Sequence, residues 1–203
     1  MDSGLTFDPA EEFNSVTEIL ESLELSGGWK IVSIDSSNII KERKDLDNAD
    51  IFCSETLIRK SPEDILEAIQ DPQVRQNWDQ SFISSSQLQN WGKNLQLVHL
   101  IQRFKWPLSD RDYVLVQGVA KNPEERITIG WKSVKYDKKP PIGQFVRGRT
   151  VFAGFVITKV DEENTHVSYY EKSFPNVPLP MFIERKMQIK AVFLPFMLKS
   201  YFK

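Results

Sequence analysis

The feature that most constrains this chain is the long segment from about Ser86 to Phe174, which is rich in β-branched and aromatic residues. Turn-forming residues interrupt it at short intervals, a pattern typical of strands joined by hairpins. The turn signals are Gly92, Asn122-Pro123, Pro140-Pro141 and 161–164, and the predicted strands are 95–105, 112–120, 126–134, 144–151, 155–160 and 165–173. Because consecutive strands with short connections pair with each other, we expect an antiparallel sheet.

Three helix starts are visible in the N-terminal part of the chain. Asp8-Pro9 supplies an N-cap acid and a first-turn proline, and Gly27-Gly28 ends the helix, so residues 1–28 form an N-terminal helical segment. Its apolar stripe is expected to consist of Phe13, Val16, Leu20 and Leu23. Ser61-Pro62 and Asp71-Pro72 open two short helices. The second is predicted to carry Arg75, Trp78 and Asp79.

The remaining segments complete the predicted order of elements. Segments 29–34, 38–43 and 51–58 predict three further strands. Prolines at 175, 178 and 180 interrupt the chain, and residues 179–203 then predict a long helix rich in Phe and Met, which Pro195 should kink. The expected fold is α+β: a curved antiparallel sheet of about nine strands wrapped around the C-terminal helix, with a hydrophobic tunnel between them.

Composition excludes several classes of protein. The net charge of −2 offers no basic surplus for nucleic-acid binding. The lone Cys53 excludes an intrachain disulfide and fits a reducing compartment. The N-terminus is acidic and unlike a secretory signal, and the longest apolar run, 191–198, is far shorter than the roughly 18 residues of a transmembrane helix. We expect one soluble, cytoplasmic domain over residues 1–203, acting as a monomer.

Three segments together resemble the START family of lipid-transfer domains, named after the steroidogenic acute regulatory protein. They are DPQVRQNWDQ at 71–80, WPLSDRDYVLV at 106–116 and PPIGQFVRGRTVFAGFVI at 140–157. The resemblance is nearest to the phosphatidylcholine-transfer members. It implies the helix-grip fold, one lipid enclosed between sheet and C-terminal helix, and no catalytic residues. It also implies that residues 175–203 and the loop 133–144 act as a lid that opens at a membrane surface.

The Arg75 and Asp79 side chains are the strongest candidates for ligand binding. From spacing alone they would form an exposed i,i+4 ion pair worth about 0.3–0.5 kcal/mol. The resemblance implies instead that the pair points into the tunnel and that Arg75 meets the lipid phosphate. A guanidinium group binds phosphate through two parallel hydrogen bonds, and a buried arginine needs a carboxylate partner.

Aromatic residues are expected to surround the lipid head. Tyr113 matches one position of the aromatic box that holds choline in related domains, by cation–π attraction. The other two positions fall near Leu100 and Val151, which are not aromatic. Candidates to replace them are Trp131, Phe152 and Phe155.

Further polar and apolar candidates lie elsewhere in the sequence. Gln102 and Gln117 are polar residues on apolar strands, where they would meet each other, a water, a ligand hydroxyl or solvent at an exposed edge. Arg147 matches a family arginine near the cavity. Phe193 and Met197 are expected to line the tunnel or the core. The adjacent Arg111 and Asp112 are interpreted as structural.

These observations predict a protein that binds one lipid, a phospholipid such as phosphatidylcholine, and transfers it between membranes. Lysines of the C-terminal helix and of the loop 133–144 would make transient contact with the membrane. The alternatives are a lipid sensor that acts through a protein partner and an enzyme on the same fold. The sequence contains no nucleophile–base arrangement, no cofactor fingerprint, and no metal spacing around His99 or His166, so we expect no catalytic activity, cofactor or metal.

Overall fold

The computed structural model describes residues 5–46, 49–92, 94–104, 108–123, 125–174, 176 and 179–203. The strands are β1 (Lys30–Asp35), β2 (Asn38–Lys44), β3 (Asp50–Ile58), β4 (Phe82–Asn90), β5 (Leu95–Gln102), β6 (Arg111–Asn122), β7 (Arg126–Ser133), β8 (Val146–Arg147), β9 (Arg149–Lys159) and β10 (Thr165–Phe174). The helices are α1 (Pro9–Leu25), α2 (Pro62–Gln70), α3 (Pro72–Arg75), α4 (Met181–Ala191) and α5 (Leu194–Tyr201).

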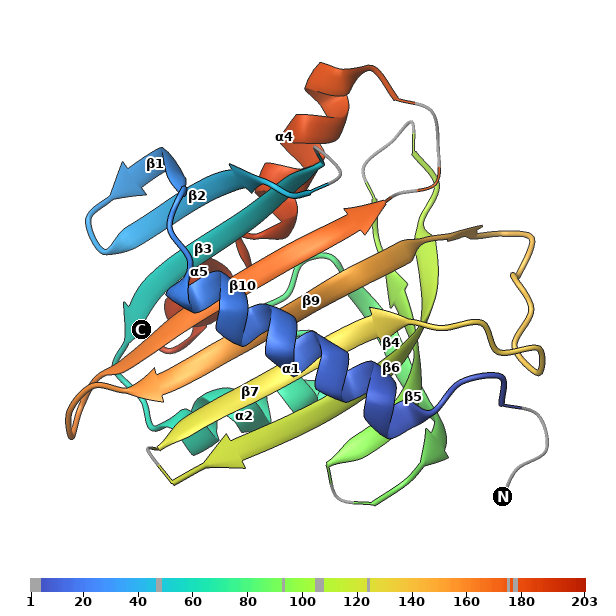
Figure 1. The fold of residues 1–203 in the computed structure, drawn as a ribbon, viewed down its shortest axis with the longest axis horizontal. Coiled ribbons are helices and arrows are strands. Elements are labelled where there is room, and N and C mark those ends of the chain that lie inside the picture. Colours follow the sequence, from blue (N-terminus) through green and yellow to red (C-terminus); the bar gives the residue numbers. More distant parts are fainter. Residues whose placement is uncertain are drawn as a thin grey trace.

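All ten strands belong to one sheet, in the order β1-β2-β3-β10-β9-β7-β6-β5-β4, with β8 beside β6. Every pairing is antiparallel except that of the short β8 with β6. The sheet curves, α1 lies across its outer face, and α2 and α5 lie behind it (Figure 1). The α+β prediction and the antiparallel sheet are therefore confirmed.

The predicted strands differ from the observed ones in two places. β4 was not predicted, because its sequence FISSSQLQN is mostly polar; it is a terminal strand that pairs only with β5. A single strand, β9, covers the end of the strand predicted at 144–151 and nearly all of that predicted at 155–160. The two-residue β8 lies in the earlier part of the first predicted strand. Small residues at Ala153 and Gly154 weaken the strand pattern at the point where the prediction divided it.

The C-terminal helix is two helices, rather than one helix kinked at Pro195. The break lies at 192–193, and Pro195 occupies the first turn of α5. Proline has no N–H to donate to the carbonyl of Ala191, so the ladder of the first helix stops before it. Pro195 then suits the start of the next helix. Pro175 and Pro178, which were expected to interrupt the chain, lie outside the described residues.

Three glycines on neighbouring strands bring α1 very close to the outer face of the sheet. Gly118 pairs with Gly130, which in turn pairs with Gly154. A Cβ at these positions would lie 2.3, 2.6 and 2.5 Å from side-chain atoms of Phe13, Val16 and Leu20, respectively. The helix therefore packs directly against backbone on this face.

The inner face holds the largest apolar cluster and receives α2 and α5. Buried Ile65 and Ile69 of α2, and Leu194 and Leu198 of α5, pack with the inward side chains of the strands. Lys199 ties α5 to the sheet through a hydrogen bond of 3.1 Å to the Thr56 hydroxyl. None of the residues of α4 is buried, so this helix stands off from the sheet.

Candidate ligand-binding cavity

A cavity of about 490 Å³ lies between the inner face of the sheet and the helices α4 and α5. Its walls are mainly apolar or aromatic, and polar side chains lie both on the sheet side and on α4. The wall residues from the sheet include Leu100, Tyr113, Leu115, Trp131, Ala153, Phe155 and Tyr169, and those from the helices include Ile183, Met187, Leu194 and Met197. An apolar cavity with a few convergent polar groups is the usual form of a small-ligand site.

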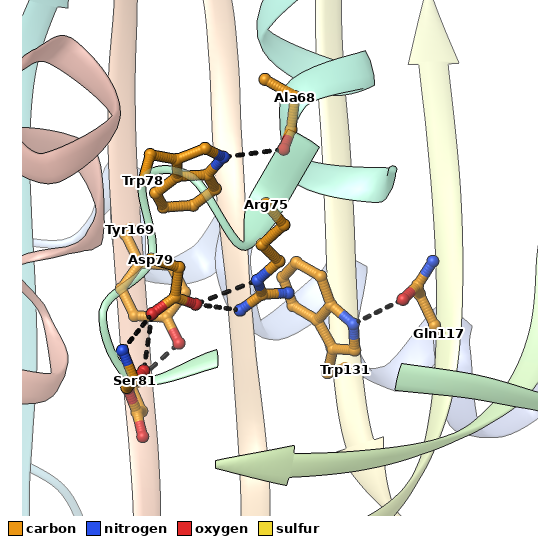
Figure 2. A network of polar contacts seen from close by, with 9 residues as sticks. Ala68, Arg75, Trp78, Asp79, Ser81, Gln117, Trp131 and Tyr169 are labelled. Atoms are coloured by element: carbon orange, nitrogen blue, oxygen red, sulfur yellow. Dashed lines mark hydrogen bonds and ion pairs between the residues drawn. The ribbon is translucent and has the colours of Figure 1, made fainter. Parts of the chain in front are cut away.

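The Arg75–Asp79 pair lies at this cavity and is not a surface salt bridge. Arg75 is 8% exposed and Asp79 is 1% exposed. Arg75 Nε lies 3.0 Å and Nη2 lies 2.9 Å from the same carboxylate oxygen, Asp79 Oδ2 (Figure 2). The other oxygen, Oδ1, accepts hydrogen bonds of 3.0 Å from Ser81 N and 2.6 Å from Ser81 Oγ. Asp79 is therefore fully engaged and fixes one edge of the guanidinium group.

The local chain explains how the pair is positioned. Asp71 caps α3 by accepting a hydrogen bond of 2.8 Å from the backbone of Gln73. The helix ends at Arg75, so the prediction that it also carries Trp78 and Asp79 is wrong. A hydrogen bond of 2.9 Å from Asp79 N to Arg75 O nevertheless continues the turn, so the two side chains still share one face.

Three aromatic rings surround the guanidinium group of Arg75. Its central carbon lies 5.3 Å from the ring centre of Phe82, 5.8 Å from that of Trp78 and 5.9 Å from that of Trp131. Trp78 is held by a hydrogen bond of 2.9 Å to Ala68 O, and Trp131 by one of 2.8 Å to Gln117 Oε1 (Figure 2). The aromatic faces stabilise the cation by cation–π attraction.

Arg75 retains hydrogen-bonding capacity toward the cavity. A guanidinium group carries five N–H donors. Among the residues that the structure describes, its hydrogen bonds run only to Asp79, while its side chain lines the cavity. The remaining N–H groups are therefore free to donate to a ligand in the cavity, while Asp79 holds the guanidinium group in place.

An acidic residue of the cavity wall, Glu171 of β10, was not predicted. Its carboxyl group accepts a hydrogen bond of 3.0 Å from Tyr169 Oη and another from Ser173 Oγ. Burial raises the pKa of Glu171; the two hydroxyl hydrogen bonds lower it, and the charge of Asp79 raises it further. The signal was present in the sequence, because Glu171 is in phase with buried Val167 and Tyr169 along the strand.

The nine predicted site residues divide into three groups. Five line the cavity: Arg75, Gln102, Tyr113, Trp131 and Met197. Asp79 and Gln117 stand behind cavity residues, as hydrogen-bond partners of Arg75 and Trp131. Arg147 and Phe193 are not part of the cavity wall.

The placements of Arg147 and Phe193 have physical reasons. Arg147 forms hydrogen bonds of 3.1 and 2.8 Å to the Asp112 carboxylate. This carboxylate neutralises the charge of Arg147 at a position outside the cavity wall. Phe193 lies at the break between α4 and α5, is 38% exposed, and packs edge-on against Phe196 at 5.5 Å.

The two glutamines do not satisfy each other. Gln117 pairs across the sheet with Gln96, whereas Gln102 pairs with Arg111 at the other end of β5. Gln117 instead accepts from the Trp131 indole, and Gln102 faces the cavity.

Asp112 lies in a buried polar cluster beneath the loop 133–144. Burial would raise the pKa of Asp112, but hydrogen bonds from Arg147 and from His99 at 3.0 Å lower it. Arg147 Nη2 also donates to Lys139 O at 3.2 Å. The cluster thus ties the loop to the sheet, in agreement with the structural interpretation of Asp112.

Of the three aromatic replacements considered for a choline box, two face the cavity. Trp131 and Phe155 line it, at a centroid distance of 6.1 Å and nearly perpendicular. Phe152 points to the opposite face, where it packs with residues of α1. Tyr169, 4.6 Å from Phe155, supplies a further ring that was not predicted.

The described residues contain no group of three or more His, Cys, Asp or Glu side chains placed to hold a metal ion. In the same part of the chain, no helix has the length and apolar character needed to cross a membrane.

Comparison with known proteins agrees with this architecture. Mouse and human START domain-containing protein 10 are each 23% identical to the chain over 124 residues, which is 61% of the chain but only 42% of those proteins. The solved structure of human StAR-related lipid transfer protein 5 has a TM-score of 0.88 at 17% identity, with 95% of each chain covered. That of human STARD10 has a TM-score of 0.83 at 18% identity, covering 99% of this chain and 82% of that one.

The similarity in three dimensions shows that the helix-grip fold is shared. The model of the START domain family matches residues 13–187. The chain therefore belongs to the START domain family of lipid-binding and lipid-transfer domains.

Proposed function

We propose that residues 1–203 act as one domain that binds a single phospholipid, phosphatidylcholine or a close relative, and transfers it between membranes. The observation that carries this proposal is the Arg75 guanidinium group, which is buried, paired on one edge with Asp79 and open to an apolar cavity on the other. A phosphate that meets the open edge would receive charge-assisted hydrogen bonds in a water-poor site.

The apolar walls suit acyl chains. Each methylene group buried from water contributes about 0.8 kcal/mol, so affinity would come chiefly from the chains and orientation from the head. Met187 and Met197 on the helix side can adapt to chains of different shape, because methionine is flexible and polarisable.

The helix α4 and the loop 133–144 are the proposed exit route. α4 has no buried residue, and its Met181 and Phe182 are 84% and 64% exposed. Arg185 attaches it to the sheet through an ion pair with Glu42. Exposed apolar side chains beside Lys186 and Lys190 suit transient contact with an anionic bilayer surface. We propose a cytoplasmic carrier that releases its lipid unchanged.

The test is transfer of a labelled phosphatidylcholine from donor to acceptor vesicles. The variant Arg75→Gln with Asp79→Asn replaces both charges together, because removing only one would leave the other buried and unpaired. The control, Lys159→Gln with Glu125→Gln, removes a partly exposed ion pair of 2.8 Å whose residues are not part of the cavity wall.

We expect the wild-type protein and the control to accelerate transfer, and the Arg75–Asp79 variant to lose about tenfold of that rate. A wild-type protein that neither retains nor transfers phosphatidylcholine would overturn the proposal. Retention of the lipid without transfer would indicate a sensor that acts through a protein partner.

A further inference from the structure

The acidic groups at and behind the sheet side of the cavity differ in whether a cation neutralises them. Arg75 and Asp79 neutralise each other at 2.9 Å. Glu171 lines the same cavity, and no Lys, Arg or His of the described residues forms an ion pair with it. The cationic side chains Arg103, Lys186 and Lys190 also reach the wall, but they are exposed to solvent.

Two hydroxyl groups hold the Glu171 carboxyl in place without neutralising it. Tyr169 Oη donates to one oxygen at 3.0 Å, and Ser173 Oγ donates to the other. Each carboxylate oxygen can accept a further hydrogen bond. The group is thus oriented toward the cavity and lacks only a positive charge.

Glu171 and the Arg75–Asp79 pair belong to one electrostatic environment. The Tyr169 hydroxyl, which donates a hydrogen bond to Glu171, is subject to the charges of both Arg75 and Asp79. The charge of Asp79 also acts on Glu171. A ligand whose phosphate meets Arg75 would therefore place its neighbouring groups near Glu171.

We propose that Glu171 determines which headgroup the cavity accepts, by selecting phospholipids that carry an ammonium group beside the phosphate over anionic phospholipids. This inference rests on the proposed phospholipid-binding function. A choline or ethanolamine head would supply the missing cation, with the rings of Phe155 and Tyr169 available for cation–π contact. An anionic head would add negative charge beside a carboxyl group that has no counter-ion, which is unfavourable in a water-poor site.

The experiment offers the protein a direct choice between the two headgroup classes. The purified protein is incubated with vesicles of equimolar dioleoyl phosphatidylcholine and dioleoyl phosphatidylglycerol, repurified, and analysed for both lipids by mass spectrometry. The variant is Glu171→Gln, which keeps the shape of the side chain and removes only its charge. The matched control is Glu162→Gln, an exposed glutamate in the turn between β9 and β10 that is not part of the cavity wall.

We expect the wild-type protein to be enriched in phosphatidylcholine. Glu171→Gln should lower the ratio of phosphatidylcholine to phosphatidylglycerol by about tenfold, since the electrostatic attraction between the carboxylate and the quaternary ammonium group is lost. Glu162→Gln should keep the wild-type ratio, and total lipid per protein should be similar in all three.

The outcomes separate this inference from the proposed function. An unchanged ratio in Glu171→Gln, or enrichment of the wild-type protein in phosphatidylglycerol, would overturn the role of Glu171 and leave phospholipid binding intact. A wild-type protein with neither lipid would overturn both. The Gln variant is expected to fold, because burial favours the uncharged form of this side chain.

Discussion

The outer and inner faces of the sheet are built from the same strands but are filled in opposite ways. On the outer face, Gly154 and its two cross-strand glycines let α1 pack directly on backbone. On the inner face the wall includes the large side chains of Trp131, Phe155 and Tyr169, yet a cavity of about 490 Å³ remains. The cavity therefore arises because its roof, α4, stands off from the sheet, and not because its walls are small.

This difference predicts that substitutions on the outer face act on stability, whereas those on the inner face act on ligand binding. The largest effect should come from Gly154→Val. Its Cβ would lie 2.5 Å from Leu20 and 2.8 Å from the backbone oxygen of Ile129, which cannot move aside. Overpacking of this kind should lower the free energy of unfolding by about 3 kcal/mol, measured by urea denaturation.

The matched control for this substitution is Gly143→Val, where a Cβ meets nothing within 4 Å. It should change the free energy of unfolding by no more than about 0.5 kcal/mol. If the two variants were equally stable, α1 would not be closely packed on the sheet.

The second largest effect on stability should come from Arg75→Ala. This substitution is an exception to the rule that inner-face changes act on ligand binding rather than on stability. Asp79 would keep its hydrogen bonds to Ser81 but lose its cation, which should lower the free energy of unfolding by about 2 kcal/mol. Arg75→Gln with Asp79→Asn should recover part of that loss. Equal denaturation curves for Arg75→Ala and the wild-type protein would mean that the pair is exposed to water.

A third substitution fills the cavity from its wall. Ala153→Leu places a larger apolar side chain in the open space and should change the free energy of unfolding by less than about 1 kcal/mol. It should nevertheless reduce the phospholipid recovered after incubation with vesicles. Ala120→Leu, at an exposed position of β6, is the control and should leave recovery unchanged. Full recovery with Ala153→Leu would place the lipid elsewhere.

The smallest effect on stability concerns Glu171 in the lipid-free protein. Because burial raises the pKa of this carboxyl group, its ionised form is disfavoured in the folded state. The penalty is absent below the ordinary pKa range of glutamate and develops as the pH rises through that range toward the raised pKa. Glu171→Gln should therefore be more stable than the wild-type protein at neutral pH. Denaturation at several pH values should show this advantage shrinking on acidification; an advantage that grew on acidification would contradict it.

Much of the fold could be predicted from the sequence because it depends on local signals. Caps such as Asp8-Pro9 and Ser61-Pro62, and the β-branched and aromatic residues along 165–173, predict elements that the structure contains. The strand β4 could not be found in this way, because a terminal strand with one face toward solvent needs few apolar residues and so lacks the usual strand pattern.

The site was harder to predict, because spacing does not show which way a face points. The four-residue spacing of Arg75 and Asp79 is the same on a surface helix and at a cavity, and only the family resemblance favoured the cavity. Phe193 was misplaced because the break before α5 turns it outward. Glu171 was overlooked although its phase along β10 indicated an inward side chain.

Native mass spectrometry tests the central claim most directly. The purified protein would be mixed with vesicles that contain many lipid classes, repurified and weighed intact. We predict a single added mass per chain that corresponds to one phospholipid molecule, with phosphatidylcholine as the main class. A protein that retains no lipid from any class would contradict the assignment of this cavity as a phospholipid site.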